Sequence, residues 1–311
     1  MQKVGFPKPK MREEKRIALI PADINRKICD PSLLHFQRGY GIDCGFSDDD
    51  YRRTGAHVVS ESDAYGLDIL CCPKFWYDDA ELVKKGQTVF GWLHLEKGDS
   101  DTRRLEDMDA TAIAWELMYK DGRSVFYRNS MLTGEIGIIH AIPYAGKHPS
   151  ECHTAVIGRG EVGKAAMRQL RKFGVKDIDI YHSKNSHLLR KVIGSYDMVI
   201  NCACASQVVL EKRHTADMKR GALLVDIGSG AVDITENRQL YRPVQEFNRG
   251  RNIYYRINHI PTLWHQTASR YISEDAAPYI NMLLKGQMDK TLADAVVIDK
   301  GRVLEDRLSN K

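Results

Sequence analysis

A glycine-rich turn between an apolar segment and a helical pattern constrains the fold of this chain most strongly. The apolar segment 153–157 leads directly into Gly158, Arg159, Gly160, Glu161, Val162 and Gly163, a G-x-G-x-x-G pattern. In such a pattern the first glycine allows a tight turn, the second lets the backbone approach a pyrophosphate, and the third lets the helix pack closely. The N–H groups that begin the helix favour phosphate. We therefore predict a βα unit that binds a dinucleotide; the alternative is a tight βα turn without a ligand.

The end of the next predicted strand indicates which dinucleotide binds. NAD sites commonly carry Asp or Glu about 20 residues after the glycines. Here the strand continues into His182, Ser183 and Lys184, and Asp179 lies inside the strand. Ser183 and Lys184 can bind a 2′-phosphate, with His182 and Arg159 assisting. We predict NADP rather than NAD; the alternative is that Lys184 is a solvated loop lysine.

Two later strand ends are expected at the same crevice. They are the small-residue stretches 202–206 and 226–230, where backbone can pass close to the nicotinamide and its ribose. We predict cofactor contacts from Cys202, Ala203 and Asp226. Asp226 is equally compatible with a role as the cap of a local turn.

Short strands alternate with helices along the chain, which predicts an α/β fold. We expect strands at 3–8, 67–72, 88–93 and 111–115, and helices at 30–39 and 127–145. The architecture predicted is two Rossmann-like domains with parallel sheets and the active site in the interdomain cleft. A substrate domain would comprise residues 1–130 plus 262–311, and a dinucleotide-binding domain residues 131–261.

Charge and cysteine content narrow the class of protein. The 46 Lys and Arg exceed the 41 Asp and Glu by five, a mild excess that fits anionic small molecules better than nucleic acid. No apolar run reaches the ~18 residues of a membrane helix, and no apolar segment follows the basic first residues. Seven cysteines, an odd number, favour a reducing cytoplasm. Cys202 and Cys204 lack a second ligand pair, so no metal is expected.

Four polar side chains stand at strand or helix ends in the first domain: Arg16, Lys74, His94 and Arg128. Arginine can hold a carboxylate with two hydrogen bonds. A lysine beside another cation has a lowered pKa, and histidine titrates near neutrality, so both can move protons. Taken singly, each is also compatible with a surface or core position that has no chemistry.

Together these features resemble the alanine dehydrogenase and pyridine nucleotide transhydrogenase superfamily. The resemblance lies in the opening Gly5-Phe6-Pro7-Lys8 and the stretch 14–21, in Lys74 and His94 after their strands, and in the place of the glycine-rich turn. The resemblance implies that Arg16 and Lys74 hold an oxo-acid substrate and that His94 is the acid/base. It also suggests a homo-oligomer.

Within that superfamily the chain resembles the N5-(carboxyethyl)ornithine synthases, in the stretches 91–94, 127–137 and 181–184. This implies an NADPH-dependent reductive condensation of a 2-oxo acid, with pyruvate as the first candidate, and the side-chain amine of ornithine or lysine. The stretch 258–263 also resembles fungal-type saccharopine dehydrogenase. That alternative would use 2-oxoglutarate and lysine, and would need a second cation such as Arg128 or Arg12.

One position departs from the family pattern. Alanine dehydrogenases carry an aspartate where this chain has Gly230, and the next acid is Asp233. The departure argues against simple ammonia-using alanine dehydrogenase activity and leaves the amine-side partner unassigned. It is also the basis of a further alternative, a protein that binds NADPH without turnover.

Overall fold

A computed structural model describes residues 1–75, 77–204, 209–228, 231–232, 242–257, 259–304 and 306–308. The chain forms two compact units. Unit 1 consists of Met1–Tyr127 together with the C-terminal segment from Trp264, and unit 2 of Arg128–Leu263. These limits fall near, but not at, the predicted residues 130 and 261. No helix among the described residues is long and apolar enough to cross a membrane.

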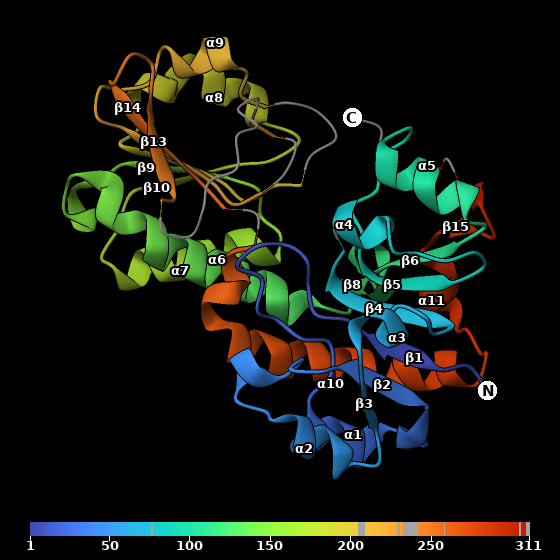
Figure 1. Cartoon of the computed structure of the whole chain (residues 1–311). Coiled ribbons are helices and arrows are strands. Elements are labelled where there is room, and N and C mark those ends of the chain that lie inside the picture. Colours follow the sequence, from blue (N-terminus) through green and yellow to red (C-terminus); the bar gives the residue numbers. More distant parts are fainter. Residues whose placement is uncertain are drawn as a thin grey trace. The chain divides into compact units, whose positions relative to one another are not determined.

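The described part of unit 1 is built on a mixed sheet (Figure 1). Its strands, in spatial order, are β16 (Arg302–Val303), β15 (Val296–Asp299), β6 (Thr111–Ala114), β5 (Thr88–Trp92), β4 (Ile69–Lys74), β1 (Val4–Phe6), β2 (Leu34–Gln37) and β3 (His57–Val59). The strands from β6 to β3 are parallel, whereas β15 and β16 are antiparallel. Parallel strands place their carboxyl ends at one edge, which is where ligands bind in α/β sheets.

In chain order, the helices of unit 1 occur between these strands. They are α1 (Pro21–Lys27), α2 (Asp48–Arg52), α3 (Glu61–Ala64), α4 (Tyr77–Ala80), α5 (Ser100–Asp107), α10 (His265–Leu284) and α11 (Lys290–Asp294). A small hairpin of β7 (Tyr119–Lys120) and β8 (Arg123–Ser124) follows β6.

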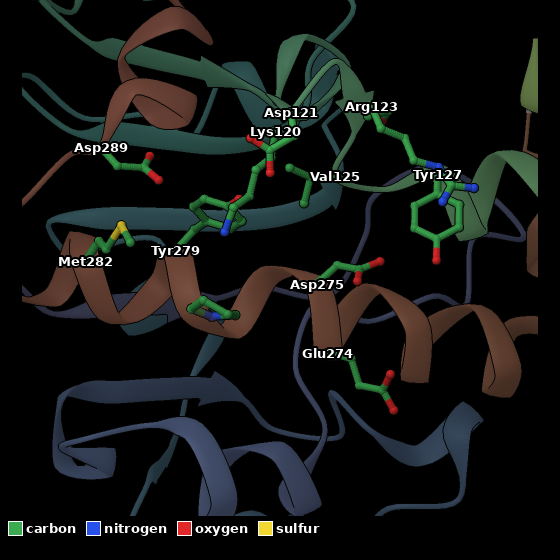
Figure 2. A pocket seen from close by; sticks show the side chains of 12 residues that line it. Lys120, Asp121, Arg123, Val125, Tyr127, Glu274, Asp275, Tyr279, Met282 and Asp289 are labelled. Carbon is green, nitrogen blue, oxygen red and sulfur yellow. The ribbon is translucent and has the colours of Figure 1, made fainter.

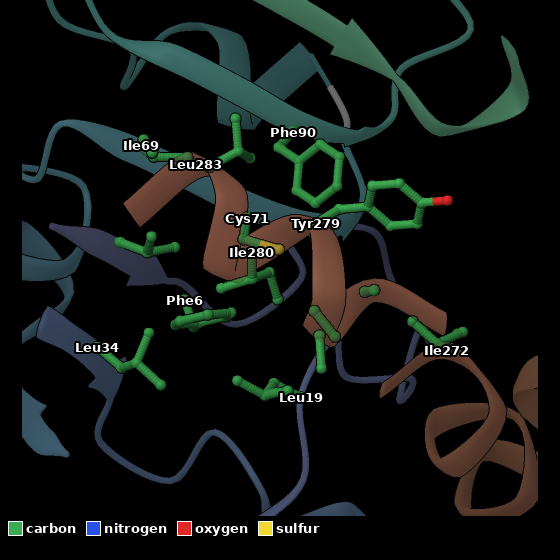
Figure 3. Close-up of a cluster of buried hydrophobic side chains, with 14 of the residues drawn as sticks. Phe6, Leu19, Leu34, Ile69, Cys71, Phe90, Ile272, Tyr279, Ile280 and Leu283 are labelled. Atoms are coloured by element: carbon green, nitrogen blue, oxygen red, sulfur yellow. The ribbon is translucent and has the colours of Figure 1, made fainter. Parts of the chain in front are cut away.

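The long helix α10 ties the C-terminal segment into the core of unit 1. Ile272, Ile280 and Leu283 belong to the same buried cluster as Phe6 and Phe90 of the sheet (Figure 3). Pro278 has no N–H to offer the carbonyl of Glu274 four residues earlier; that carbonyl accepts a hydrogen bond from Lys27 Nζ at 3.0 Å instead. Unit 1 therefore needs both ends of the chain.

One predicted helix is wrong. The stretch 30–39 forms a 3-10 turn at Pro31–Leu33 and then strand β2. In β2 the side chains of Leu34 and Phe36 are buried and those of His35 and Gln37 are half-buried, which is the alternation of a strand. The first turn of this segment is compatible with a helix, but the segment forms a strand because it pairs with β1 on one side and β3 on the other.

Unit 2 contains a second sheet, and in chain order its helices come before and between the strands. The described strands, in spatial order, are β10 (Ile178–Tyr181), β9 (Thr154–Ile157), β11 (Met198–Asn201), β12 (Leu223–Asp226), β14 (Asn252–Arg256) and β13 (Val244–Phe247). All pairs are parallel except β13 with β14. The helices are α6 (Tyr127–Ala141), α7 (Glu161–Lys172), α8 (Ser186–Val192) and α9 (Lys212–Thr215).

Helix α6 leads from unit 1 into unit 2 and packs closely against α7. A Cβ at Gly134 would overlap the carbonyl oxygen of Val162, so the approach of the two helices depends on that glycine. The prediction of an α/β protein with two parallel-rich sheets in two units is confirmed, with antiparallel strands added at β13, β15 and β16.

Candidate active and cofactor-binding sites

Arg16 is a buried cation held in one orientation. Its side chain is 4% exposed; Nε donates to Glu14 Oε1 at 2.8 Å and Nη2 to Glu14 Oε2 at 2.6 Å. The guanidinium lies 5.2 Å from the ring centroid of Trp92. The loop that follows is anchored to α10, because the N–H of Ile17 donates to Ser269 Oγ at 3.0 Å. A planar guanidinium fixed in this way is suited to a carboxylate ligand.

Lys74 is the last residue of β4 and is 8% exposed. The strand shifts register between Cys72 and Lys74, where Pro73 offers no N–H, and Lys74 lies beside Trp92 of β5. A Cβ at Gly91 would overlap the carbonyl oxygen of Cys72, so this irregular pairing requires glycine there. This shift in register sets where the lysine leaves the sheet.

The surroundings of Lys74 prepare it to exchange a proton. Burial and, next, the charge of Arg16 lower the pKa of Lys74 to about 8, although the charges of Glu116 and Glu14 act in the opposite direction. Lys74 therefore titrates within the working range of an acid/base group. The same interactions place the charges of Arg16, Lys74 and the two glutamates in one cluster.

His94 follows β5 in a left-handed backbone conformation, with φ at 48°. Glu116 holds this turn: it accepts the N–H of His94 at 2.5 Å and that of Leu93 at 3.3 Å. The Nδ1 atom of His94 lies 3.8 Å from Glu116 Oε1, and the histidine side chain is 56% exposed. Burial raises the pKa of Glu116, and the N–H groups of His94 and Leu93 and the charge of Lys74 oppose that rise.

The structure thus brings Arg16, Lys74 and His94 into one group, linked by Glu14 and Glu116. Sequence reasoning assigned no role to Glu14, Glu116 or Trp92. The position of Glu116 could have marked it as a candidate site residue, since it comes two residues after β6 at the carboxyl edge of the sheet. Arg128 is the second residue of α6 and belongs to unit 2, so its predicted place in the substrate site stays a prediction.

The glycine-rich turn has the backbone that a dinucleotide needs. Gly158 has φ at 100°, and a Cβ there would lie 2.9 Å from the nitrogen of Ala203. A Cβ at Gly163 would overlap the carbonyl oxygen of Gly158, so the third glycine permits the close packing of α7. By contrast, a Cβ at Gly160 would meet no protein atom within 4 Å. The open space before α7, whose first residues are Glu161 and Val162, fits a pyrophosphate.

The end of β10, where we predict that the dinucleotide is selected, carries no carboxylate. Asp179 pairs in register with Ala155 within the sheet, and its carboxylate contacts His153 Nε2 at 3.0 Å and Tyr196 OH at 2.8 Å. His153 precedes β9, so this contact lies toward the amino ends of the strands. The carboxyl end of β10 is followed by His182, which is partly exposed, and by Ser183 and Lys184, which are exposed. Arg159 of the glycine turn is exposed as well.

Asp226 is enclosed within unit 2. It is 1% exposed, and its oxygens accept hydrogen bonds from Asn201, Tyr254 and Arg256. Burial raises the pKa of Asp226, and the charge of Arg256 opposes that rise. Cys202 is buried and Ala203 half-buried beside Gly158. Gly230, Asp233 and Asn258 lie outside the described residues.

A cavity of about 500 Å³ lies elsewhere in unit 1, between the β7–β8 hairpin and α10 (Figure 2). Asp121, Glu274, Asp275 and Asp289 line it together with basic and aromatic side chains, and Arg16, Lys74 and His94 do not. Within the described ranges, no group of three or more His, Cys, Asp or Glu is placed to hold a metal ion.

The chain is similar to known proteins over nearly its full length. It is 24% identical over 302 residues to N(5)-(carboxyethyl)ornithine synthase of Clostridium botulinum, covering 89% of this chain and 93% of that protein. It is 24% identical over 324 residues to alanine dehydrogenase of Methanococcus maripaludis, covering 89% and 86%.

Solved structures show the same fold. An L-alanine dehydrogenase superposes with a TM-score of 0.74 at 20% identity, covering 97% of this chain and 96% of that one. A transhydrogenase from Sinorhizobium meliloti superposes with a TM-score of 0.75 at 16% identity, covering 97% and 100%.

Family models cover both halves of the chain. The model "Alanine dehydrogenase/PNT, N-terminal domain" matches residues 5–132, and "Alanine dehydrogenase/PNT, C-terminal domain" matches residues 154–307. The two matches take in both the Arg16–Lys74–His94 group and the glycine-rich turn. The chain therefore belongs to the alanine dehydrogenase/pyridine nucleotide transhydrogenase family, a family of NAD(P)-dependent oxidoreductases.

Proposed function

We propose that this protein catalyses an NADPH-dependent reductive condensation of a 2-oxo acid, with pyruvate as the first candidate, and the side-chain amine of ornithine or lysine. The product is an N-(carboxyethyl) amino acid. The observation that carries the proposal is the buried Lys74, with its pKa at about 8, beside the fixed guanidinium of Arg16. The similarity to N(5)-(carboxyethyl)ornithine synthase supports the substrate class.

The reaction joins two substrates with loss of water and then adds a hydride. The amine attacks the oxo-acid carbonyl to give a carbinolamine, which loses water to form an imine. Arg16 holds the carboxylate of the oxo acid, and Lys74 and His94 supply and remove the protons of the dehydration. NADPH, when bound, supplies the hydride that reduces the imine.

The choice of NADPH rests on the end of β10. A 2′-phosphate adds negative charge, and Lys184 with Arg159 offers two exposed cations to balance it. The sequence from Tyr181 to His187 contains no acid that would bind the two ribose hydroxyls of NAD. The proposal needs both units, because the cofactor cradle belongs to unit 2 and the acid/base group to unit 1.

The test is NADPH oxidation, followed by nicotinamide absorbance, over a matrix of substrates. Pyruvate and 2-oxoglutarate are each combined with ornithine, lysine or ammonia, with NADH in parallel. We expect oxidation with pyruvate plus a diamino acid, and preference for NADPH. Oxidation with 2-oxoglutarate plus lysine would instead indicate a saccharopine-type enzyme. Tight NADPH binding without oxidation by any pair would contradict the proposal and favour a binding protein.

Product analysis completes the test. Mass spectrometry of the reaction with pyruvate and ornithine should show one product that has gained the carboxyethyl group. His94→Ala should reduce turnover by about 10²–10⁴-fold if His94 is the acid/base. Turnover equal to that of the wild type in this variant would remove His94 from the mechanism.

A further inference from the structure

Four strand ends form a row across the carboxyl edge of the unit 2 sheet. Ile157 of β9 is in register with Asn201 of β11, Asn201 with Asp226 of β12, and Asp226 with Arg256 of β14. The residue after Ile157 is Gly158, the first glycine of the cofactor turn. Asn201 therefore lies on the strand next to the dinucleotide cradle, and Asp226 and Arg256 lie on the two strands beyond it.

Hydrogen bonds join these polar residues into one relay. Asp226 Oδ1 accepts from Asn201 Nδ2 at 2.8 Å, and Asp226 Oδ2 accepts from Arg256 Nη1 at 2.5 Å and from Tyr254 OH at 3.0 Å. The Arg256 side chain is 14% exposed and Asp226 1% exposed, so the buried carboxylate has its counter-charge beside it. Such a pair is costly to break, because either partner alone would be a buried charge.

The relay ends on a backbone group. Asn201 Oδ1 accepts the N–H of Ala203 at 3.0 Å, so the amide of Asn201 is fixed at both of its ends. Ala203 lies between two glycines: a Cβ at Gly158 would lie 2.9 Å from its nitrogen, and a Cβ at Gly228 would overlap its carbonyl oxygen. The position of residues 202–203 is therefore coupled to the shape of the glycine turn.

We propose that Asn201 and Asp226 are positioning residues for the cofactor. With Arg256 as counter-charge, they hold residues 202–203 against the Gly158 turn and so set the affinity for a nicotinamide dinucleotide without contacting it. Asp226 thereby acts through Asn201 rather than as the direct ligand that the sequence predicted. This inference rests on the proposed binding of NADPH.

The chain offers a matched control for the test. Asn252 is also a buried asparagine of the same sheet, 1% exposed, but it lies at the amino end of β14. Its Nδ2 donates to the carbonyl of Lys219 at 2.7 Å. Asn252→Ala removes a comparable buried amide at the end of β14 opposite to Arg256. Asn201→Ala, in contrast, removes the link between Asp226 and Ala203.

The experiment is a fluorescence titration of the full-length protein with NADPH, together with thermal unfolding of each variant. We expect Asn201→Ala to raise the Kd for NADPH by about tenfold or more, with kcat at saturating NADPH and KM for the oxo acid within about threefold of the wild type. Asn252→Ala should lower the unfolding temperature but leave the Kd within about twofold.

A second variant perturbs the same segment without removing a polar side chain, since a Cβ at residue 228 would lie 2.8 Å from Asn201 Nδ2. Gly228→Ala places a methyl group against the carbonyl of Ala203 and should also weaken NADPH binding. Wild-type Kd in both Asn201→Ala and Gly228→Ala would overturn the inference, as would equal weakening by Asn252→Ala. A wild-type protein that binds neither NADPH nor NADH would contradict the proposed function itself.

Discussion

At the scale of single residues, Lys74 combines burial with proximity to another cation. A lysine with its pKa at about 8 carries its charge below pH 8 and loses it above that value. If the charged form helps Arg16 to hold the oxo acid, affinity for that anion must fall as the pH rises through 8.

This dependence gives a direct test of Lys74. The affinity of the enzyme–NADP⁺ complex for pyruvate, measured by calorimetry between pH 6.5 and 9.5, is expected to weaken with a midpoint near pH 8. Lys74→Arg keeps the charge throughout this range, so its affinity should show no such midpoint. A wild-type midpoint that persists in Lys74→Arg would assign the titration to another group.

Glu116 tunes this lysine and holds the turn at His94. Its charge raises the pKa of Lys74, so Glu116→Gln should move the midpoint of pyruvate binding to lower pH. Because an amide accepts hydrogen bonds less strongly than a carboxylate, turnover should fall as well. A midpoint that does not move would show that solvent screens the interaction. The calorimetric pH series described for Lys74 serves as the measurement.

The sequence allowed Arg16, Lys74 and His94 to be singled out because each stands at the end of a predicted strand or in a family motif. Glu116 could not be assigned in this way. Its contact with His94 depends on the pairing of β5 with β6, which aligns Gly91 with Ala114 and so brings the residues that follow each strand together. That register is a property of the sheet and not of either segment alone.

At the scale of structural elements, the βα turn separates two roles of glycine. A Cβ at Gly160 meets only open space and its φ of −72° suits any residue, whereas a Cβ at Gly163 overlaps the turn itself. Gly163 is therefore needed for folding, whereas Gly160 is free to serve a ligand.

Two alanine substitutions test this separation. Gly160→Ala should keep the unfolding temperature of the wild type yet weaken NADPH binding by at least about tenfold, because its methyl group enters the expected phosphate space. Gly163→Ala should lower the unfolding temperature by several degrees through backbone displacement. Calorimetry and NADPH titration read out both effects. Unchanged NADPH affinity in Gly160→Ala would place the ligand elsewhere.

The elements of unit 2 follow from the sequence more closely than those of unit 1. Strands β9, β11 and β12 are mostly apolar and buried throughout, which is typical of central parallel strands. The segment around β2 begins with Asp30 and Pro31, which also favour a helix start, so local signals pointed to the wrong element there. Its neighbours β1 and β3 determine its structure.

At the scale of the whole molecule, the two units differ in how the chain builds them. Unit 2 uses one continuous stretch, Arg128–Leu263, and unit 1 uses both ends of the chain. Compact units formed by one continuous stretch can often fold alone.

A fragment of residues 128–263 should therefore fold cooperatively and bind NADPH with an affinity within about tenfold of the intact protein, but show no turnover. Far-ultraviolet circular dichroism on heating and NADPH titration are the measurements. A fragment of residues 1–127 provides the contrast, since it lacks α10 and β15 and should not unfold cooperatively. Turnover by the 128–263 fragment alone would contradict the roles given to Arg16, Lys74 and His94.

The split of unit 1 also has a consequence for synthesis on the ribosome. The residues of unit 2 leave the exit tunnel before α10 does, so unit 2 can fold while unit 1 still lacks the helix that fills its core. During that interval the edge of β6 that later pairs with β15 is exposed. An uncovered strand edge invites pairing with other chains, so we expect the newly made N-terminal half to be most exposed to aggregation during this interval.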